Sequence, residues 1–158
     1  MLQHIRRLYD HLEWADHRIL SALRSGQESP QCGKLLAHIV AAEAIWLARL
    51  RGDSAPLPVW PSLSILECGS LLDQNRSGFS QYLASLTDAA LRQSVAYRNS
   101  AGTELCTPVV DILLHVALHG SYHRGQLAAE LRRSGVQPPG MDYIEFVRSA
   151  PAASQNSG

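Results

Sequence analysis

The sequence predicts an all-α fold, a four-helix bundle in a single domain. Four long segments repeat apolar residues at intervals of three and four, the period of an amphipathic α-helix. A chain of 158 residues is long enough for one core and too short for two. Amphipathic helices in so small a domain bury their apolar stripes against one another. We expect this domain to span residues 1–148 and the small, polar residues 149–158 to form a flexible C-terminal tail.

The first two helices are predicted on either side of a short turn. An apolar stripe marks a helix over residues 2–25, with Gly26 as a stop. A second stripe marks a helix from about residue 31, directly after Pro30. Gly52 ends this second helix, as glycine commonly does.

The third helix follows a loop. Residues 53–62 contain three prolines, which exclude a regular helix there. Ser64 and Glu67 form the capping-box pattern, in which each side chain bonds the backbone N–H of the other residue. We therefore expect a helix to begin near Ser64 and its apolar stripe to continue to Leu86.

A short β-hairpin is predicted before the fourth long helix. Two runs without helical period, 92–98 and 103–107, flank the turn-forming residues 99–102. Pro108 suits the first turn of the helix that follows, and Gly135 marks its end.

The loop lengths bear on the topology. A short turn joins the first two helices, whereas the next two connections are long enough to run the length of the bundle. We expect crossover connections, although a simple up-and-down arrangement fits the loop lengths equally well. After the fourth helix, two prolines and a glycine break the chain, and residues 142–149 predict one or two further helical turns.

Composition excludes several classes of partner. Lys and Arg total 14 and Asp and Glu total 14, so no basic excess is present to bind nucleic acid. Charged residues and histidine interrupt the longest apolar stretches before they reach membrane-spanning length. The N-terminal segment has no apolar core of a secretory signal. These features predict a cytoplasmic protein that does not bind membranes.

Three histidines at a strict spacing of four carry the strongest indication of function. His115, His119 and His123 lie on one face of the predicted fourth helix. Two neutral imidazoles one turn apart chelate a divalent transition metal. Because His115 and His123 are about 12 Å apart along the helix axis, they cannot share one ion. The metal pair is therefore either His115 with His119 or His119 with His123.

A third ligand is expected from another helix. His38 lies inside the apolar segment of the second helix, where burying an unpaired imidazole would be costly. It is the natural donor, and the alternative is a hydrogen-bonded histidine at the margin of the core. Tyr122 and Arg124 could contact a bound ligand, and Glu43 lies near His38. Packing of the tyrosine between helices and salt bridges of the two charged residues are the favoured roles.

Two segments of the chain resemble a known family. The first covers residues 35–52 and the second residues 119–146. The second contains the run Tyr-His-Arg-Gly-Gln, followed by a leucine-rich turn, Gly135, the prolines and Asp142-Tyr143. Together they resemble the DinB/YfiT-like superfamily of metal-binding four-helix bundles. The resemblance covers nearly the whole chain.

The resemblance implies a metal site of three histidines. Carried over residue by residue, these ligands are His38, His119 and His123, and His115 becomes an additional histidine one turn before the pair. Its role is then either to contact substrate or a ligand, or to be hydrogen-bonded at the margin of the core. Members of the superfamily bind zinc, nickel or iron, and an all-imidazole site suits each of these metals.

The resemblance also implies an activity. The superfamily includes S-transferases and isomerases that use mycothiol, bacillithiol or glutathione. We therefore expect a metal-dependent transferase that activates a low-molecular-weight thiol cosubstrate toward a small-molecule substrate in a stress response. A metal-dependent hydrolase and a non-catalytic metal-binding stress-response protein are the alternatives. A homodimer is common in the superfamily and is expected here.

Overall fold

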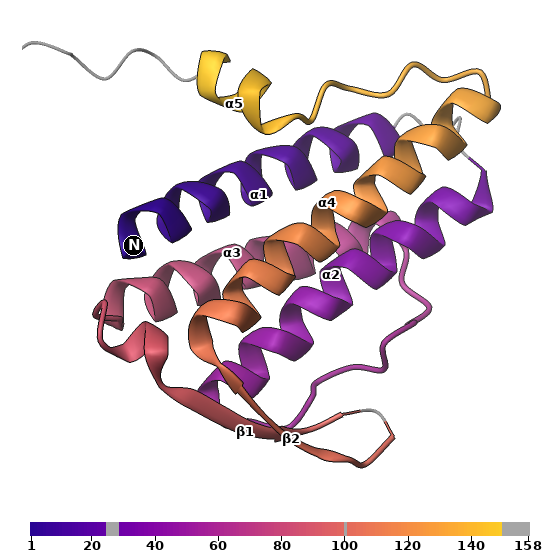
Figure 1. The fold of residues 1–158 in the computed structure, drawn as a ribbon. Coiled ribbons are helices and arrows are strands. Elements are labelled where there is room, and N and C mark those ends of the chain that lie inside the picture. The colour runs from indigo at the N-terminus through magenta and orange to yellow at the C-terminus, as the bar shows by residue number, and fades with distance from the viewer. Residues whose placement is uncertain (25–28, 100, 150–158) are drawn as a thin grey trace, which may run out of the picture.

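The computed structural model describes residues 1–24, 29–99 and 101–149 and has the predicted architecture, a helical bundle with a small two-stranded antiparallel sheet (Figure 1). Its elements in chain order are α1 (Leu2–Leu23), α2 (Pro30–Arg51), α3 (Ile65–Ser85), the 3-10 turn η1 (Ala90–Arg92), β1 (Ser94–Arg98), β2 (Glu104–Pro108), α4 (Val109–Arg133) and α5 (Tyr143–Ser149). All the predicted helices and the β-hairpin are present.

Local sequence signals account for most of the helix boundaries. Ser64 and Glu67 form the expected capping box at the start of α3. Gly52 has a φ of 79°, the left-handed conformation that ends α2. Pro108 is the N-cap residue of α4, one position before the first helical turn in which it was expected. Helix α1 ends at Leu23, two residues before the predicted end, and Gly26 lies outside the described residues.

The contacts between helices define the bundle. Helices α1 and α2 each pack against α3 and α4 and lie diagonally opposite each other. Asn75 on α3 donates a hydrogen bond to the carbonyl of Val40 on α2, and Gly33 lies beside Ile65, so α2 and α3 run parallel. The connection between them therefore crosses over along the bundle, which confirms a crossover (Figure 1). The connection from α3 to α4 instead folds into η1 and the hairpin at one end of the bundle (Figure 1).

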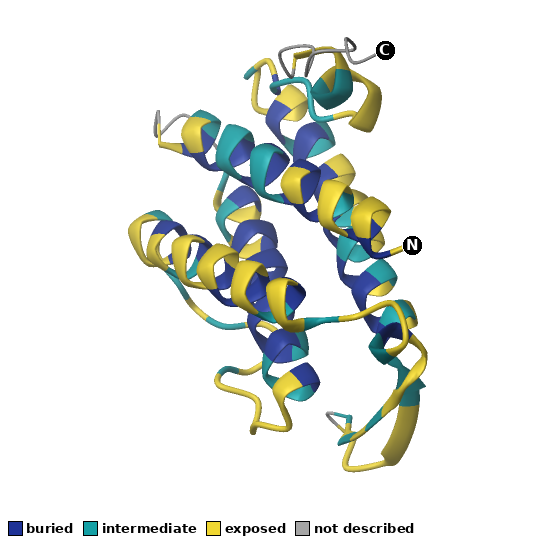
Figure 2. Ribbon diagram, turned by 90° about the vertical axis from the view of Figure 1, so that its left-hand side faces the viewer, coloured by how far each residue is buried: buried dark blue, intermediate teal, exposed yellow. Residues whose placement is uncertain are grey.

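The core consists of two apolar clusters with a polar layer between them. One cluster lies toward the hairpin and includes Leu12, Phe79 and Leu113, and the other lies at the opposite end and includes Leu36 and Leu131. Buried positions face inward on all four long helices (Figure 2). No helix within the described residues is long and apolar enough to cross a membrane.

Each long helix contributes one buried polar side chain to the layer between the clusters. These residues are Asp16 on α1, Glu43 on α2, Asn75 on α3 and Arg124 on α4. Arg124 Nη1 bonds Asp16 Oδ1 at 2.8 Å, and Asn75 Nδ2 donates to Glu43 Oε2 at 3.1 Å. A Cβ atom at Gly120 would lie 2.8 Å from Arg124 Nη1, so the absence of a side chain there gives the guanidinium room.

The C-terminal segment packs against α1. His11 Nε2 donates a hydrogen bond to the carbonyl of Met141 at 2.8 Å, and its ring lies near Tyr143 and Phe146 of α5. His11 therefore helps to hold the C-terminal segment against α1. Ser149 is the last residue of α5, and the rest of the predicted tail, residues 150–158, lies outside the described residues.

Candidate metal centre

Three histidines from two helices converge on the surface between α2 and α4. His38 Nε2 lies 3.2 Å from His119 Nε2 and 3.2 Å from His123 Nε2. One ligand atom from each of the three lies within 4.8 Å of the others. Four-coordinate zinc with nitrogens at about 2.0 to 2.1 Å separates its ligand atoms by about 3.3 Å, so the spacing suits a shared ion. The three residues could hold a metal ion.

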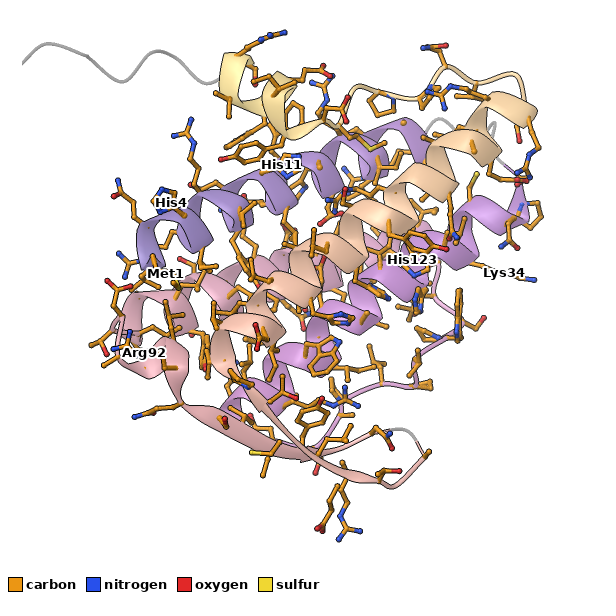
Figure 3. The ribbon with its side chains drawn as sticks, viewed as in Figure 1. Met1, His4, His11, Lys34, Arg92 and His123 are labelled. Carbon is orange, nitrogen blue, oxygen red and sulfur yellow. The ribbon has the colours of Figure 1, made fainter. Side chains whose placement is uncertain are left out.

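The geometry distinguishes between the two histidine pairs that the spacing left open. Helices α2 and α4 are antiparallel, so His38 meets α4 at the turn that carries His119 and His123 (Figure 3 labels His123). His115 lies one turn away, with its ring 5.4 Å from that of His119, and is not part of the cluster. The residues that the resemblance selected are thus the ones that lie together.

Hydrogen bonds on the outer nitrogens orient two of the rings. His38 Nδ1 lies 2.8 Å from the carbonyl oxygen of Val59, and His123 Nδ1 lies 2.8 Å from Gln126 Oε1. Both oxygens are acceptors, so each Nδ1 carries the proton and each Nε2 presents a lone pair. Lone pairs that face each other at 3.2 Å repel unless a proton or a cation lies between them. Such outer-nitrogen hydrogen bonds are typical of histidines that bind metals.

Burial favours the neutral form of two of the imidazoles, those of His38 and His119. Burial, followed by the neighbouring His123, His38 and His115, lowers the pKa of His119 to about 4. Burial is also the main cause that lowers the pKa of His38. Because a protonated imidazole cannot bind a metal, these shifts keep His38 and His119 available as ligands at neutral pH.

This pKa shift predicts how the stability of the metal-free protein depends on pH. His119 has a pKa of about 4 in the folded protein and an ordinary value of 6.5 in the unfolded chain. Between these values the unfolded state binds the additional proton, so the free energy of unfolding decreases as the pH falls through this window. Urea denaturation in the presence of a chelator, at about pH 7 and about pH 5, should show a smaller decrease for His119→Gln than for the original protein.

A surface histidine provides the control for this measurement. His4 is exposed on α1, far from His123 (Figure 3). His4→Gln should lose stability on acidification as the original protein does. An equal loss in His119→Gln, His4→Gln and the original protein would contradict the assignment of the pH dependence to His119.

The crossover loop supplies two contacts to the site that the sequence did not predict. Besides the carbonyl of Val59, it places the ring of Trp60 against His38, stacked at a centroid distance of 3.8 Å and an interplanar angle of 10°. Trp60 remains 58% exposed, so it borders the site at the surface. Both residues lie in an irregular, proline-rich loop, where no periodicity relates a residue to a helix face. Only the presence of tryptophan in such a loop was a signal.

The residues around the histidines have roles that the structure distinguishes. Arg124 is buried in an ion pair with Asp16, as the salt-bridge interpretation predicted. Glu43 bonds Asn75 and lies in the polar layer. Tyr122 is 65% exposed, so it does not pack between helices as its ordinary role would require. The exposed His115 makes an edge contact with Trp46 at 5.1 Å and extends the row of imidazoles along α4.

Comparisons with known proteins agree with this architecture. A family model described as the DinB family matches residues 1–157. The chain is 23% identical to Protein DinB of Bacillus subtilis (strain 168), over 87% of this chain and 90% of that protein. Its fold is similar to the crystal structure of a DinB-like protein from Bacillus cereus ATCC 10987, with a TM-score of 0.54 and 20% identity, over 89% of this chain and 95% of that one.

Proposed function

The chain belongs to the DinB family, and from this premise we propose that it is a metal-dependent enzyme that activates a low-molecular-weight thiol for transfer to an electrophilic small molecule. The observation that supports the proposal is the convergence of three imidazoles within 4.8 Å of one another. His38 is buried and His119 and His123 are half-buried, so the cluster has one side within the protein and one toward solvent. An exposed side is what an open coordination position for substrate requires.

The neutral ligand set favours activation of a nucleophile. Three neutral imidazoles leave a bound divalent cation its full charge, which lowers the pKa of a coordinated thiol or water. His38 and His123 are oriented by Val59 and Gln126, so two of the rings are fixed before a ligand arrives. Trp60 borders His38 and the exposed Tyr122 neighbours His123, so aromatic surface is available to a substrate beside the histidines.

An activity screen tests the proposal. The purified protein is loaded separately with zinc, nickel and iron(II) and incubated with mycothiol, bacillithiol or glutathione and the electrophile monochlorobimane. We expect thiol conjugation that needs the metal and is lost on chelation. His119→Ala is the inactive control and His115→Ala the matched control, because His115 is on the same helix face outside the cluster.

Other outcomes distinguish the alternatives. Metal-dependent hydrolysis of an activated ester without thiol would replace the transferase with a hydrolase, since an imidazole-bound metal also activates water. Stoichiometric metal binding without thiol conjugation or ester hydrolysis would indicate a non-catalytic metal-binding protein. Conjugation that continues unchanged after chelation would contradict a metal-dependent mechanism.

A further inference from the structure

A group of one arginine and three rings lies beside the candidate metal centre, on the side toward the β-hairpin. It consists of Trp46 and Arg49 of α2, Tyr97 of β1 and His115 of α4. The ring of His115 lies 5.4 Å from that of His119 and 5.1 Å from that of Trp46. Burial, followed by the charge of Arg49, lowers the pKa of His115. The group is therefore continuous with the clustered histidines.

The helical repeat places Arg49 on the same face of α2 as His38. The two residues are eleven positions apart, which is about three turns of an α-helix. The Arg49 side chain lies back along the helix, since its Cζ atom is 4.4 Å from the centroid of the Trp46 ring. Trp46 is two turns from His38, about 12 Å along the helix axis. The guanidinium group thus lies roughly 12 Å from the level of the metal ligands.

Two aromatic rings hold the Arg49 side chain in place. Its Cζ atom lies 4.4 Å from the ring centroid of Trp46 and 4.9 Å from that of Tyr97. Both distances are within the limit of about 6 Å for favourable cation–π contacts. Nη2 also donates a hydrogen bond to the carbonyl of Arg98 at 3.4 Å. The guanidinium group is therefore oriented before a ligand arrives, and binding would restrict it little further.

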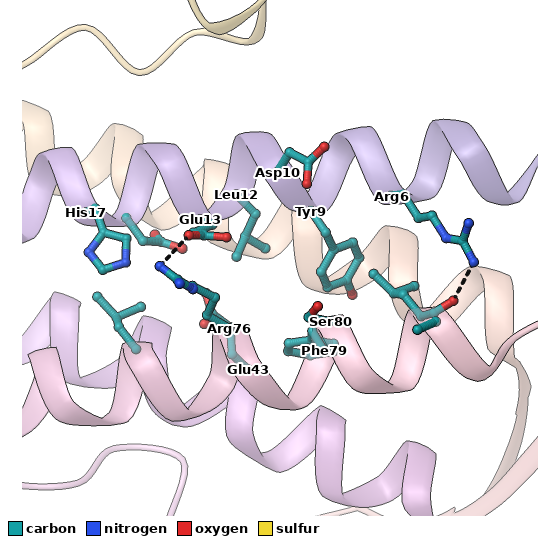
Figure 4. Close-up of a pocket in the computed structure, with 14 residues that line it drawn as sticks. Arg6, Tyr9, Asp10, Leu12, Glu13, His17, Glu43, Arg76, Phe79 and Ser80 are labelled. Atoms are coloured by element: carbon teal, nitrogen blue, oxygen red, sulfur yellow. Dashed lines mark hydrogen bonds and ion pairs between the residues drawn. The ribbon is translucent and has the colours of Figure 1, made fainter. Parts of the chain in front are cut away.

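Arg49 has no acidic partner among the described residues. Its one hydrogen bond there uses Nη2, and burial lowers its pKa without a carboxylate to oppose the shift. Other arginines are paired: Arg76 Nη1 lies 3.0 Å from Glu13 Oε1 at the cavity between α1 and α3 (Figure 4), and Arg124 bonds Asp16. A half-buried cation without a counter-charge favours an anionic ligand.

A carboxylate is the anion that matches this arginine. The planar guanidinium group presents its N–H donors as a fork that fits the two oxygens of a carboxylate. We propose that Arg49 binds a carboxylate of the thiol cosubstrate while the thiolate lies at the candidate metal centre. This inference rests on the proposed function and narrows it. The cosubstrate is then a thiol that carries a carboxylate, as glutathione and bacillithiol do, and not the uncharged mycothiol.

The separation of the two sites fits thiols of this size. A metal–sulfur bond and a hydrogen bond to Arg49 together cover about 5 Å of the distance. The remaining span of roughly 7 Å corresponds to about two residues of extended chain. An arm of about this length joins the thiol of glutathione to its terminal carboxylates. The rings of His115 and Trp46 lie along the path, where they can contact the body of the thiol.

Matched thiols test the need for a carboxylate. A thiolate bound to cobalt(II) gives a charge-transfer absorption, so titration of the cobalt-loaded protein measures thiol affinity without turnover. Glutathione is compared with its diethyl ester, which keeps the thiol and the chain but lacks both carboxylates. We expect glutathione to bind at least about tenfold more tightly, since hydrogen bonds between charged groups are the stronger ones. Equal affinities of glutathione and the ester would overturn the proposal.

Arg49→Gln tests the assignment to this arginine. Glutathione affinity should fall by about tenfold or more, and affinity for the diethyl ester should stay as in the original protein. Arg51→Gln is the matched control, because it removes the same charge from the same helix on the side where Arg51 bonds the carbonyl of Gly78 of α3. Cobalt stoichiometry reports whether each variant is folded. An equal loss of glutathione affinity in both variants, or an equal loss for both thiols in Arg49→Gln, would overturn the assignment.

2-Mercaptoethanol separates this inference from the proposed function. It is a small uncharged thiol, so we expect it to give the cobalt–thiolate absorption with equal affinity in the original protein and in Arg49→Gln. If no thiol gave this absorption, the proposed function would fail and this inference with it. If every thiol bound regardless of its carboxylates, the proposed function would stand and only the role of Arg49 would be wrong.

Discussion

His119→Ala is expected to abolish tight metal binding. His119 Nε2 lies 3.2 Å from His38 Nε2, and the residue also lies one turn from His123, so its removal leaves two imidazoles on different helices. A two-ligand site cannot complete the three-residue set that open zinc sites use. We expect the dissociation constant for zinc to increase by about 100-fold or more, as loss of one ligand removes more affinity than loss of a supporting hydrogen bond. Competition with a chromophoric chelator measures this dissociation constant.

His115→Ala is the matched control for this substitution. It removes an imidazole from the same face of the same helix but outside the cluster, so zinc affinity should change by less than about threefold. If His115→Ala reduced affinity as much as His119→Ala, the ligand set would be wrong. Retention of stoichiometric metal by His119→Ala would contradict it as well.

Arg124→Met is expected to destabilise the fold by about 3–5 kcal/mol, the usual cost of breaking one partner of a buried ion pair. Arg124 and Asp16 are 2% and 0% exposed, and their contact is 2.8 Å. Removal of the guanidinium leaves the carboxylate of Asp16 in the core, next to Glu43, without its cation. The free energy of unfolding from urea denaturation, followed by circular dichroism, measures the effect.

Two further variants show whether the loss comes from the unpaired charge. Arg133→Met removes an arginine of the same helix whose pair with Glu130 is at the surface, so it should cost about 0–1 kcal/mol. Asp16→Leu combined with Arg124→Met removes both charges and should recover much of the stability. A double variant no more stable than Arg124→Met alone would show that packing, and not charge, determines the loss.

The fold was largely predictable because its signals are local. The capping box of Ser64 with Glu67 and the left-handed Gly52 act within one turn of the chain, and apolar periodicity identifies the helices. The pairing of helices was not predictable, because amphipathic stripes show that a helix is buried but do not show against which partner. The crossover connection of residues 53–64 determines which helices pair. The length of this loop was compatible with both the crossover and the up-and-down topology.

The candidate site was predictable in part for similar reasons. The spacing of four placed His115, His119 and His123 on one face of α4. The choice between the two histidine pairs needed the family resemblance, because it depends on which turn of α4 lies beside His38 of α2. Val59, Trp60 and the partnership of Arg124 with Asp16 depend on contacts between distant segments, which leave no pattern in the sequence. Zinc, nickel or iron as the metal, the thiol cosubstrate and the homodimer stay predictions.

The separation of the histidines along the chain determines when the cluster can form during synthesis. His38 and His119 are 81 residues apart, and all of α3 and the hairpin lie between them. During synthesis, His38 leaves the ribosome long before α4 has been made. Helix α4 by itself can offer only two adjacent imidazoles to one metal ion. The three-histidine cluster therefore arises as a late product of docking α4 onto α2, and a metal ion can be captured by all three only in the assembled bundle.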